Sequence, residues 1–232
     1  MLVCIIHYNT PELIAAAIRS LHKHTPGCRV IIFDNSDRRS FSAGRGSATA
    51  LTMTIDNTRG QIIPFNNWLA TIPDKQPTNN GYASAKHCLT VQWLIDNIPS
   101  QEPFLLMDSD ILICRDVAPL FDSTQAFVGK TELSLSRNGN VMRVLPYLLY
   151  INTPMVKAHG VSFFNQNKMW ALTSSRPDNA YDTGAWFLED CHNHHLPYRD
   201  IDISKYCIHL GHASWKNKNA AAWLKEHEYL WK

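Results

Sequence analysis

The chain has 232 residues, of which 45% are hydrophobic and 18% charged, and these values are typical of a globular protein and exclude a disordered one. The 22 Lys and Arg residues almost balance the 20 Asp and Glu residues and are scattered, so the charge pattern gives no support for nucleic-acid binding. No apolar run is long enough to span a bilayer, and the apolar start lacks a basic leader, so we expect a cytoplasmic protein that is at most peripheral to a membrane.

A β-α-β unit opens the sequence. Residues 2–6 form a continuous apolar strand, Pro11 fits the first turn of a helix with regularly spaced apolar residues, and residues 29–33 form a second apolar strand. Asp34 ends this second strand. A carboxylate at this position can accept hydrogen bonds from a nucleotide base or ribose, but an Asx turn that closes the strand explains it equally well.

Strands and helices alternate along the rest of the chain. The expected strands are residues 51–55, 104–107, 126–129, 141–151 and 206–210, and the expected helices are residues 83–98, 181–195 and 220–230. The six cysteines include no Cys-x-x-Cys pair, so we interpret them as reduced and mostly buried thiols. The order of strands and helices along the chain predicts an α/β fold.

Two carboxylates, Asp108 and Asp110, follow the apolar run of residues 104–107 directly. Open α/β sheets bind ligands beyond the carboxyl ends of their strands. Carboxylate oxygens suit Mg²⁺ or Mn²⁺, which in turn hold phosphates. A capped turn is the alternative, but an unpaired carboxylate at the end of a buried strand is costly, and this favours a metal site.

Two later segments carry further candidate residues. His209 and His212 flank Gly211 and can present imidazoles to a metal or a diphosphate, although a single histidine is more often an ordinary surface or hydrogen-bonded residue. Asp182 opens the helix expected at residues 181–195, where it is either the N-cap, which is the default, or a functional carboxylate. The histidine-rich run 191–195 resembles a zinc cluster only in composition and fits a helix end better.

Taken in order, these features resemble a GT-A fold glycosyltransferase of the family 2 type. The resemblance rests on Tyr8 and Asn9 after the first strand, on the strand that ends at Asp34, and on the helix that precedes Asp108-Ser109-Asp110. It implies one α/β domain over residues 1–232, with a mostly parallel central sheet and helices on both faces. Residues 1–115 would be the nucleotide-binding half and residues 116–232 the acceptor-side half.

The resemblance also implies a donor site and a metal site. Asp34 would contact the nucleotide base, Tyr8 and Asn9 would line the same pocket, and Asp108 would contact the ribose or the metal. The implied ligands of Mn²⁺ or Mg²⁺ are Asp108, Asp110, His209 and His212. The implied activity moves a sugar from a nucleotide-diphosphate donor to a glycan or lipid-linked acceptor hydroxyl, in surface glycan synthesis.

Inversion at the anomeric carbon is the outcome that the resemblance implies. It requires a carboxylate that removes the proton from the acceptor hydroxyl. Asp182 is the first choice for this base, with Glu189 and Asp190 behind it.

Three alternatives stay open from the residues alone. A phosphatase of the haloacid dehalogenase type also places Asp-x-Asp after a strand, but that motif usually opens the chain. A nucleotidyltransferase shares the sheet and the metal, but it usually carries an early glycine-rich phosphate loop, which this sequence lacks. A nucleotide-sugar-binding module without catalysis is the non-enzymatic alternative.

Overall fold

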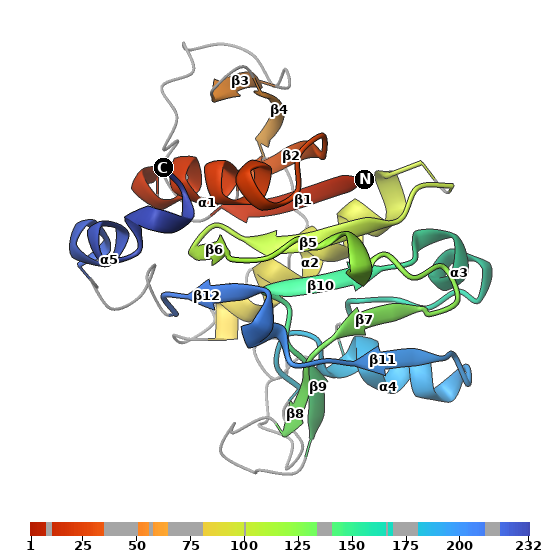
Figure 1. Cartoon of the computed structure of the whole chain (residues 1–232). Helices are drawn as coiled ribbons and strands as arrows, with labels where there is room; N and C mark the ends of the chain where they lie inside the picture. The colour runs from red at the N-terminus through yellow and green to blue at the C-terminus, as the bar shows by residue number, and fades with distance from the viewer. Residues whose placement is uncertain are drawn as a thin grey trace. The chain divides into compact units, whose positions relative to one another are not determined.

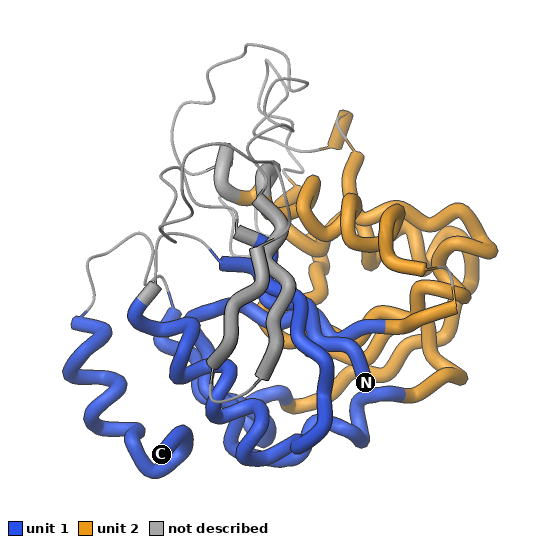
Figure 2. The backbone as a smooth tube through the Cα atoms, turned by 90° about the horizontal axis from the view of Figure 1, so that it is seen from above, with its two compact units in different colours: residues 1–66, 104–121, 203–232 blue, residues 67–103, 122–202 orange. Residues whose placement is uncertain are grey.

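The computed structural model describes residues 1–7, 11–34, 51–55, 58–64, 81–99, 101–133, 141–165, 167–168, 181–211 and 219–232. The chain separates into two compact units (Figure 2). The first unit comprises residues 1–66, 104–121 and 203–232, and the second comprises residues 67–103 and 122–202. Each unit is therefore assembled from segments that are distant in the sequence.

A mostly parallel sheet forms the centre of the first unit. Its strands lie in the order β5 (Phe104–Asp108), β1 (Leu2–His7), β2 (Arg29–Asp34), β4 (Thr58–Pro64) and β3 (Leu51–Ile55). All are parallel to their neighbours except β3, which pairs antiparallel with β4. Every residue of β1 is buried, which explains its unbroken apolar run. β4 is not among the predicted strands because its first half, residues 58–61, is polar.

Helix α1 (Pro11–His24) connects β1 to β2, as predicted. Glu12 lies in its first turn and His22, Lys23 and His24 lie in its last turn, so these charges complement the helix dipole. The buried apolar stripe of the helix consists of Leu13, Ile14, Ala17, Ile18 and Leu21. This stripe gives the spacing from which the helix is predicted.

A two-stranded ribbon and a closing helix complete the first unit (Figure 1). β6 (Ile111–Ile113) pairs antiparallel with β12 (Cys207–His209). The predicted closing helix is α5 (Ala220–Glu226), which lies against α1 and continues as a 3₁₀ turn over Glu228–Leu230. Two further 3₁₀ turns cover Ala118–Leu120 and Ile203–Lys205. Leu230, Ala16 and Leu112 form the buried centre where these elements meet.

A buried hydroxyl connects α1 to β6. Ser20 Oγ donates to the carbonyl oxygen of Ala17 at 2.8 Å and accepts from the amide of Ile113 at 2.9 Å. We expect Ser20→Ala to lower the free energy of unfolding by about 1–3 kcal/mol, because it leaves the Ile113 amide buried without this acceptor. Urea denaturation measures the loss, and Ser123→Ala at an exposed position is the control. Equal and small losses in both variants would contradict this role of Ser20.

The second unit holds the remaining strands. β7 (Phe127–Gly129) pairs antiparallel with β10 (Leu148–Ile151) and parallel with β11 (Tyr198–Asp200). β8 (Thr131–Leu133) and β9 (Met142–Val144) form a separate antiparallel pair. An aromatic cluster lies in this unit, and in it the Phe127 and Tyr198 rings stack with their centroids 4.7 Å apart. Phe187 contacts both Phe127 and Phe163.

Among the residues that the structure describes, the helices of the second unit are α2 (Gly81–Asn97), α3 (Thr153–Ala158) and α4 (Ala185–Asn193). The helix predicted from residue 181 begins only at Ala185. The prediction that Asp182 could be its N-cap is wrong, because Gly184 takes this position at a φ of 82° and no side chain caps the helix. The Ala185 amide instead donates to the backbone oxygen of Asp182 at 3.0 Å.

The six cysteines are free, and all except Cys114 are buried. Burial raises the pKa of Cys88 and of Cys207 to about 12, which keeps these thiols protonated at neutral pH. The expectation of reduced and mostly buried thiols is confirmed. Within the described residues, no helix combines the length and the apolar composition that crossing a bilayer requires.

Candidate functional site

Two of the predicted acidic residues end the two strands that flank β1, at one edge of the parallel sheet. The backbone register pairs Ile6 of β1 with Asp108 of β5, and His7 of β1 with Asp34 of β2. Asp34 and Asp108 are therefore the last residues of the strands on either side of β1. Because open α/β sheets bind their ligands beyond this edge, it is the first place to look for a site.

Three potential metal ligands come together at this edge. Asp108, Asp110 and His209 each offer one ligand atom, and these atoms lie within 4.8 Å of one another. His209 Nε2 lies 3.2 Å from Asp110 Oδ1, and the two side chains are 29% and 15% exposed. Two carboxylates and an imidazole suit a divalent cation such as Mn²⁺, which accepts both oxygen and nitrogen ligands. The residues present therefore fit the predicted metal.

The ribbon of β6 and β12 brings His209 to the two aspartates. β12 pairs with β6 so that His209 faces Ile111, the residue directly after Asp110. The Leu210 amide donates to the Asp110 carbonyl oxygen at 3.0 Å. Ser109, between the two aspartates, is buried, and its amide donates to the Ile6 carbonyl oxygen at 3.2 Å. The backbone of the turn that carries the two carboxylates is thus held on both sides.

The structure describes only part of the predicted nucleotide pocket. Tyr8, Asn9 and His212 lie outside the described residues, and Asp34 is described by its backbone alone. His7, which ends β1 between Asp34 and Asp108, is fully buried and is absent from the predicted site. Its only sequence signal is a polar residue that directly extends an apolar strand.

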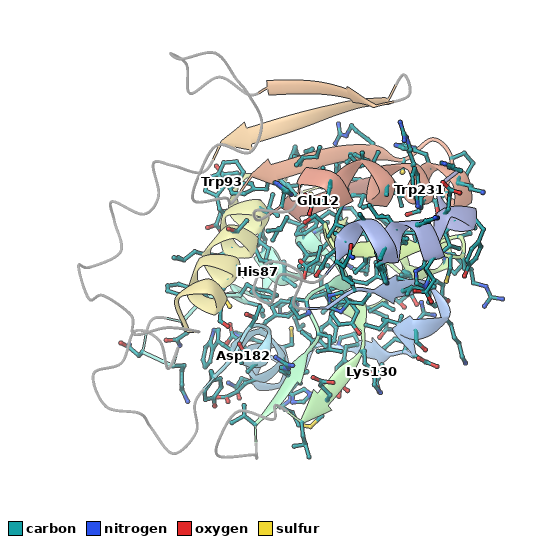
Figure 3. All side chains as sticks on the ribbon, turned by 90° about the vertical axis from the view of Figure 1, so that its left-hand side faces the viewer. Glu12, His87, Trp93, Lys130, Asp182 and Trp231 are labelled. Atoms are coloured by element: carbon teal, nitrogen blue, oxygen red, sulfur yellow. The ribbon has the colours of Figure 1, made fainter. Side chains whose placement is uncertain are left out.

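Asp182 lies in the second unit, beside α4 (Figure 3), and its carboxylate already has several donors. Arg143 Nη1 lies 2.5 Å from its Oδ2, and Ser84 Oγ donates to its Oδ1 at 2.6 Å. Arg143 also binds Glu132, which it faces across the β8–β9 pair, at 2.7 Å. No local pattern in the sequence predicts this group, because the strand register brings Glu132 and Arg143 together.

The other two candidate bases lie on α4. Asp190 is buried, and its Oδ2 accepts from the amide of Ser162 at 2.8 Å and from the Ser162 hydroxyl at 3.3 Å. Glu189 is the more exposed of the two, and it binds the Tyr181 hydroxyl and the Lys168 ammonium. Asp190 therefore holds the backbone around Ser162 in place, whereas the side chain of Glu189 is more exposed to solvent.

The histidine-rich run that follows is the end of α4, as predicted. Cys191 is buried, while His192, His194 and His195 are exposed around the last turn. His194 Nε2 lies 3.9 Å from Asp190 Oδ1, one turn back along the helix. This arrangement is typical of histidines that interact with a helix end.

Comparisons with known proteins identify the fold. No protein-family model and no curated protein matches the sequence. The solved structure of the galactosyltransferase LgtC in complex with donor and acceptor sugar analogues is similar over 87% of this chain and 74% of its own, at 15% identity and a TM-score of 0.54. An active-site mutant of LgtC is similar over 87% and 73%, at 15% identity and a TM-score of 0.51. The chain has the GT-A fold, and the predicted α/β class with a mostly parallel central sheet is confirmed.

Proposed function

We propose that this chain, which has the GT-A fold, is a glycosyltransferase that moves a sugar from a nucleotide-diphosphate donor to an acceptor hydroxyl. The observation that carries the proposal is the cluster of Asp108, Asp110 and His209 at the carboxyl edge of the parallel sheet. The likeness to LgtC, whose structure holds donor and acceptor sugar analogues, supports the same activity. The sequence resemblance supports a glycan or lipid-linked acceptor, and surface glycan synthesis in the cytoplasm as the setting.

Asp108, Asp110 and His209 would hold the divalent cation. A cation bound there supplies positive charge that offsets the charge of the departing nucleotide diphosphate. The two carboxylates supply negative charge at partly buried positions, where electrostatic attraction is stronger than in water. The imidazole of His209 adds a nitrogen ligand, and this mixed set of ligands favours Mn²⁺ over Mg²⁺.

The nucleotide is proposed to bind next to this cluster, on the other side of β1. Asp34 is the last residue of β2, where its backbone pairs with His7, and it would accept hydrogen bonds from the base or ribose. Tyr8 and Asn9 follow β1 directly in the sequence and would line the same pocket. Asp108, as the last residue of β5, would contact the ribose or the metal.

We also propose that the sugar transfer inverts the configuration at the anomeric carbon and that a carboxylate acts as the base. Asp182 remains the first candidate, although it would have to exchange a donor such as Arg143 for the acceptor hydroxyl. Glu189 and Asp190 follow it, and the burial of Asp190 makes it the weakest of the three. Asp182→Asn tests this role, because a base variant loses turnover and keeps donor affinity. The anomeric configuration of the product, read by NMR, tests inversion.

The activity itself is tested by a thermal-shift screen with nucleoside diphosphates, followed by a transfer assay. We expect one nucleoside diphosphate to stabilise the protein when Mn²⁺ is present, by about 2.7 kcal/mol at a concentration of about 100 times its Kd. The matching nucleotide sugar should then release that nucleoside diphosphate in the presence of acceptor. Pyrophosphate released from a nucleoside triphosphate would indicate a nucleotidyltransferase instead. Binding without any turnover would indicate a nucleotide-sugar-binding module.

A further inference from the structure

The second unit holds an ammonium group against two aromatic rings and a carboxylate, at residues that have no part in the proposed metal site. Lys168 Nζ lies 5.0 Å from the centroid of the Tyr181 ring and 5.7 Å from that of the Trp186 ring. It also lies 3.4 Å from Glu189 Oε1. We call Tyr181, Trp186 and Glu189 the ammonium corner, since these three side chains surround one cation.

The three side chains of the ammonium corner are held in place without help from Lys168. Trp186 and Glu189 are three residues apart on α4, so their side chains lie on the same face of the helix. Trp186 Nε1 donates to Ser162 Oγ at 2.8 Å, which sets the direction of the indole ring. The Tyr181 hydroxyl donates to Glu189, and the Tyr181 side chain is buried. The corner is therefore preorganised.

The orientation of the rings suits a shared cation. Their centroids lie 6.5 Å apart and their planes are tilted by 55°, so that one ammonium can contact both rings. Burial lowers the pKa of Lys168, but Tyr181 and Glu189 raise it more, and the pKa lies above its ordinary value. The corner thus favours the charged form of an amine. Aromatic rings combined with a carboxylate are the chemistry by which proteins recognise organic ammonium groups.

Lys168 is held less firmly than the three side chains of the ammonium corner. Its side chain is 42% exposed, and its distance of 3.4 Å from Glu189 exceeds the 2.7–2.9 Å of a strong charge-assisted hydrogen bond. Ion pairs with this degree of exposure contribute little to stability. A competing ammonium group could therefore replace Lys168 while the corner keeps its shape.

We propose that the ammonium corner is a binding site for a ligand that carries a primary ammonium group, and that Lys168 is its resident occupant, which the ligand displaces. The ammonium could belong to an amino sugar or to an ethanolamine headgroup, since both offer the same group. The proposal requires neither a nucleotide nor a metal, so it can fail or succeed independently of the glycosyltransferase proposal.

The test uses the full chain and Lys168→Met, which removes the ammonium and keeps an apolar stem of similar length. n-Butylammonium chloride is titrated at constant ionic strength while the indole N–H signal of Trp186 is followed by NMR, with Trp186→Phe to assign that signal. We expect saturable binding to Lys168→Met and roughly tenfold weaker binding to the wild type, because the resident ammonium competes. Adding Glu189→Gln to Lys168→Met should weaken binding by roughly tenfold as well.

Two comparisons make the result specific. 1-Butanol is the neutral control and should leave the Trp186 signal unchanged. Tighter binding of glucosamine than of ethanolamine would support an amino sugar as the ligand, and the reverse order would support an ethanolamine headgroup. Lys168→Gln replaces Lys168→Met if the latter does not give a folded spectrum. Absence of saturable binding, equal affinity in variant and wild type, or an equal response to 1-butanol would each overturn the proposal.

Discussion

Asp110→Ala is expected to abolish the Mn²⁺-dependent binding of a nucleoside diphosphate while the protein stays folded. The substitution removes one of the two carboxylates in the cluster and the partner that lies 3.2 Å from His209 Nε2. Loss of a residue that only supports a metal ligand already costs roughly 10- to 100-fold in affinity, so loss of a ligand itself should cost more. Isothermal titration calorimetry, with and without Mn²⁺, measures the change.

Asp116→Ala is the matched control for this experiment. Asp116 lies in the same unit, a few residues after β6, but its carboxylate binds the Thr25 hydroxyl and the Ala118 amide and is outside the cluster. The Asp116→Ala variant should therefore retain its metal-dependent affinity for the nucleoside diphosphate, even if it loses some stability. A circular dichroism spectrum establishes that both variants are folded. If Asp110→Ala bound the nucleotide with unchanged metal dependence, the proposed site would be wrong.

Gly184→Ala is expected to cause the largest loss of stability among Gly→Ala substitutions at Gly129, Gly160 and Gly184, the glycines of the second unit whose surroundings the structure describes. Gly184 has a φ of 82°, and a Cβ built on it would lie 2.1 Å from the backbone oxygen of Val144. A left-handed conformation alone costs an alanine about 1–2 kcal/mol. The clash adds to this cost, because β9 must move, so we expect a total of about 3–5 kcal/mol. Chemical denaturation measures the free energy of unfolding.

Gly160→Ala separates the two contributions to this loss. Gly160 has a φ of 68°, but no atom lies within 4 Å of its added Cβ. Its substitution should therefore cost only the conformational part, about 1–2 kcal/mol. Similar losses at Gly160 and Gly184 would show that the contact with Val144 is unimportant. A clearly larger loss at Gly184 would support close packing of the segment before α4 against β9.

Local patterns in the sequence predict most of the elements. The buried run of β1 and the apolar stripe of α1 have the periods of a strand and a helix, and both form where they are expected. The paired aspartates after β5 are visible because charges rarely interrupt a buried strand. β4 is not predicted, since half of its residues are polar and its pairing with β2 and β3 defines it as a strand. The single strand predicted over residues 141–151 is wrong, because this segment forms two strands, β9 and β10, which pair with different partners.

The boundary before α4 shows where a local pattern misleads. Asp182 is a residue type favoured at N-caps, and the apolar spacing after it is helical. The helix nevertheless starts at Ala185, with Gly184 at the N-cap position. The carboxylate of Asp182 instead binds Arg143 and Ser84 from other elements, which are tertiary contacts that no local preference predicts.

By itself, the sequence determined the α/β class, the places of the main strands and helices, and the two aspartates of the candidate metal site, because each of these depends on residues close together in the chain. His209 is named as a further ligand only through the family resemblance, and the tertiary structure places it beside the two aspartates. His209 reaches Asp110 through the register of β12 on β6, and Lys168 reaches Tyr181 and Glu189 through the packing of α4. Such pairs depend on strand register and helix packing between distant segments, which no local periodicity encodes.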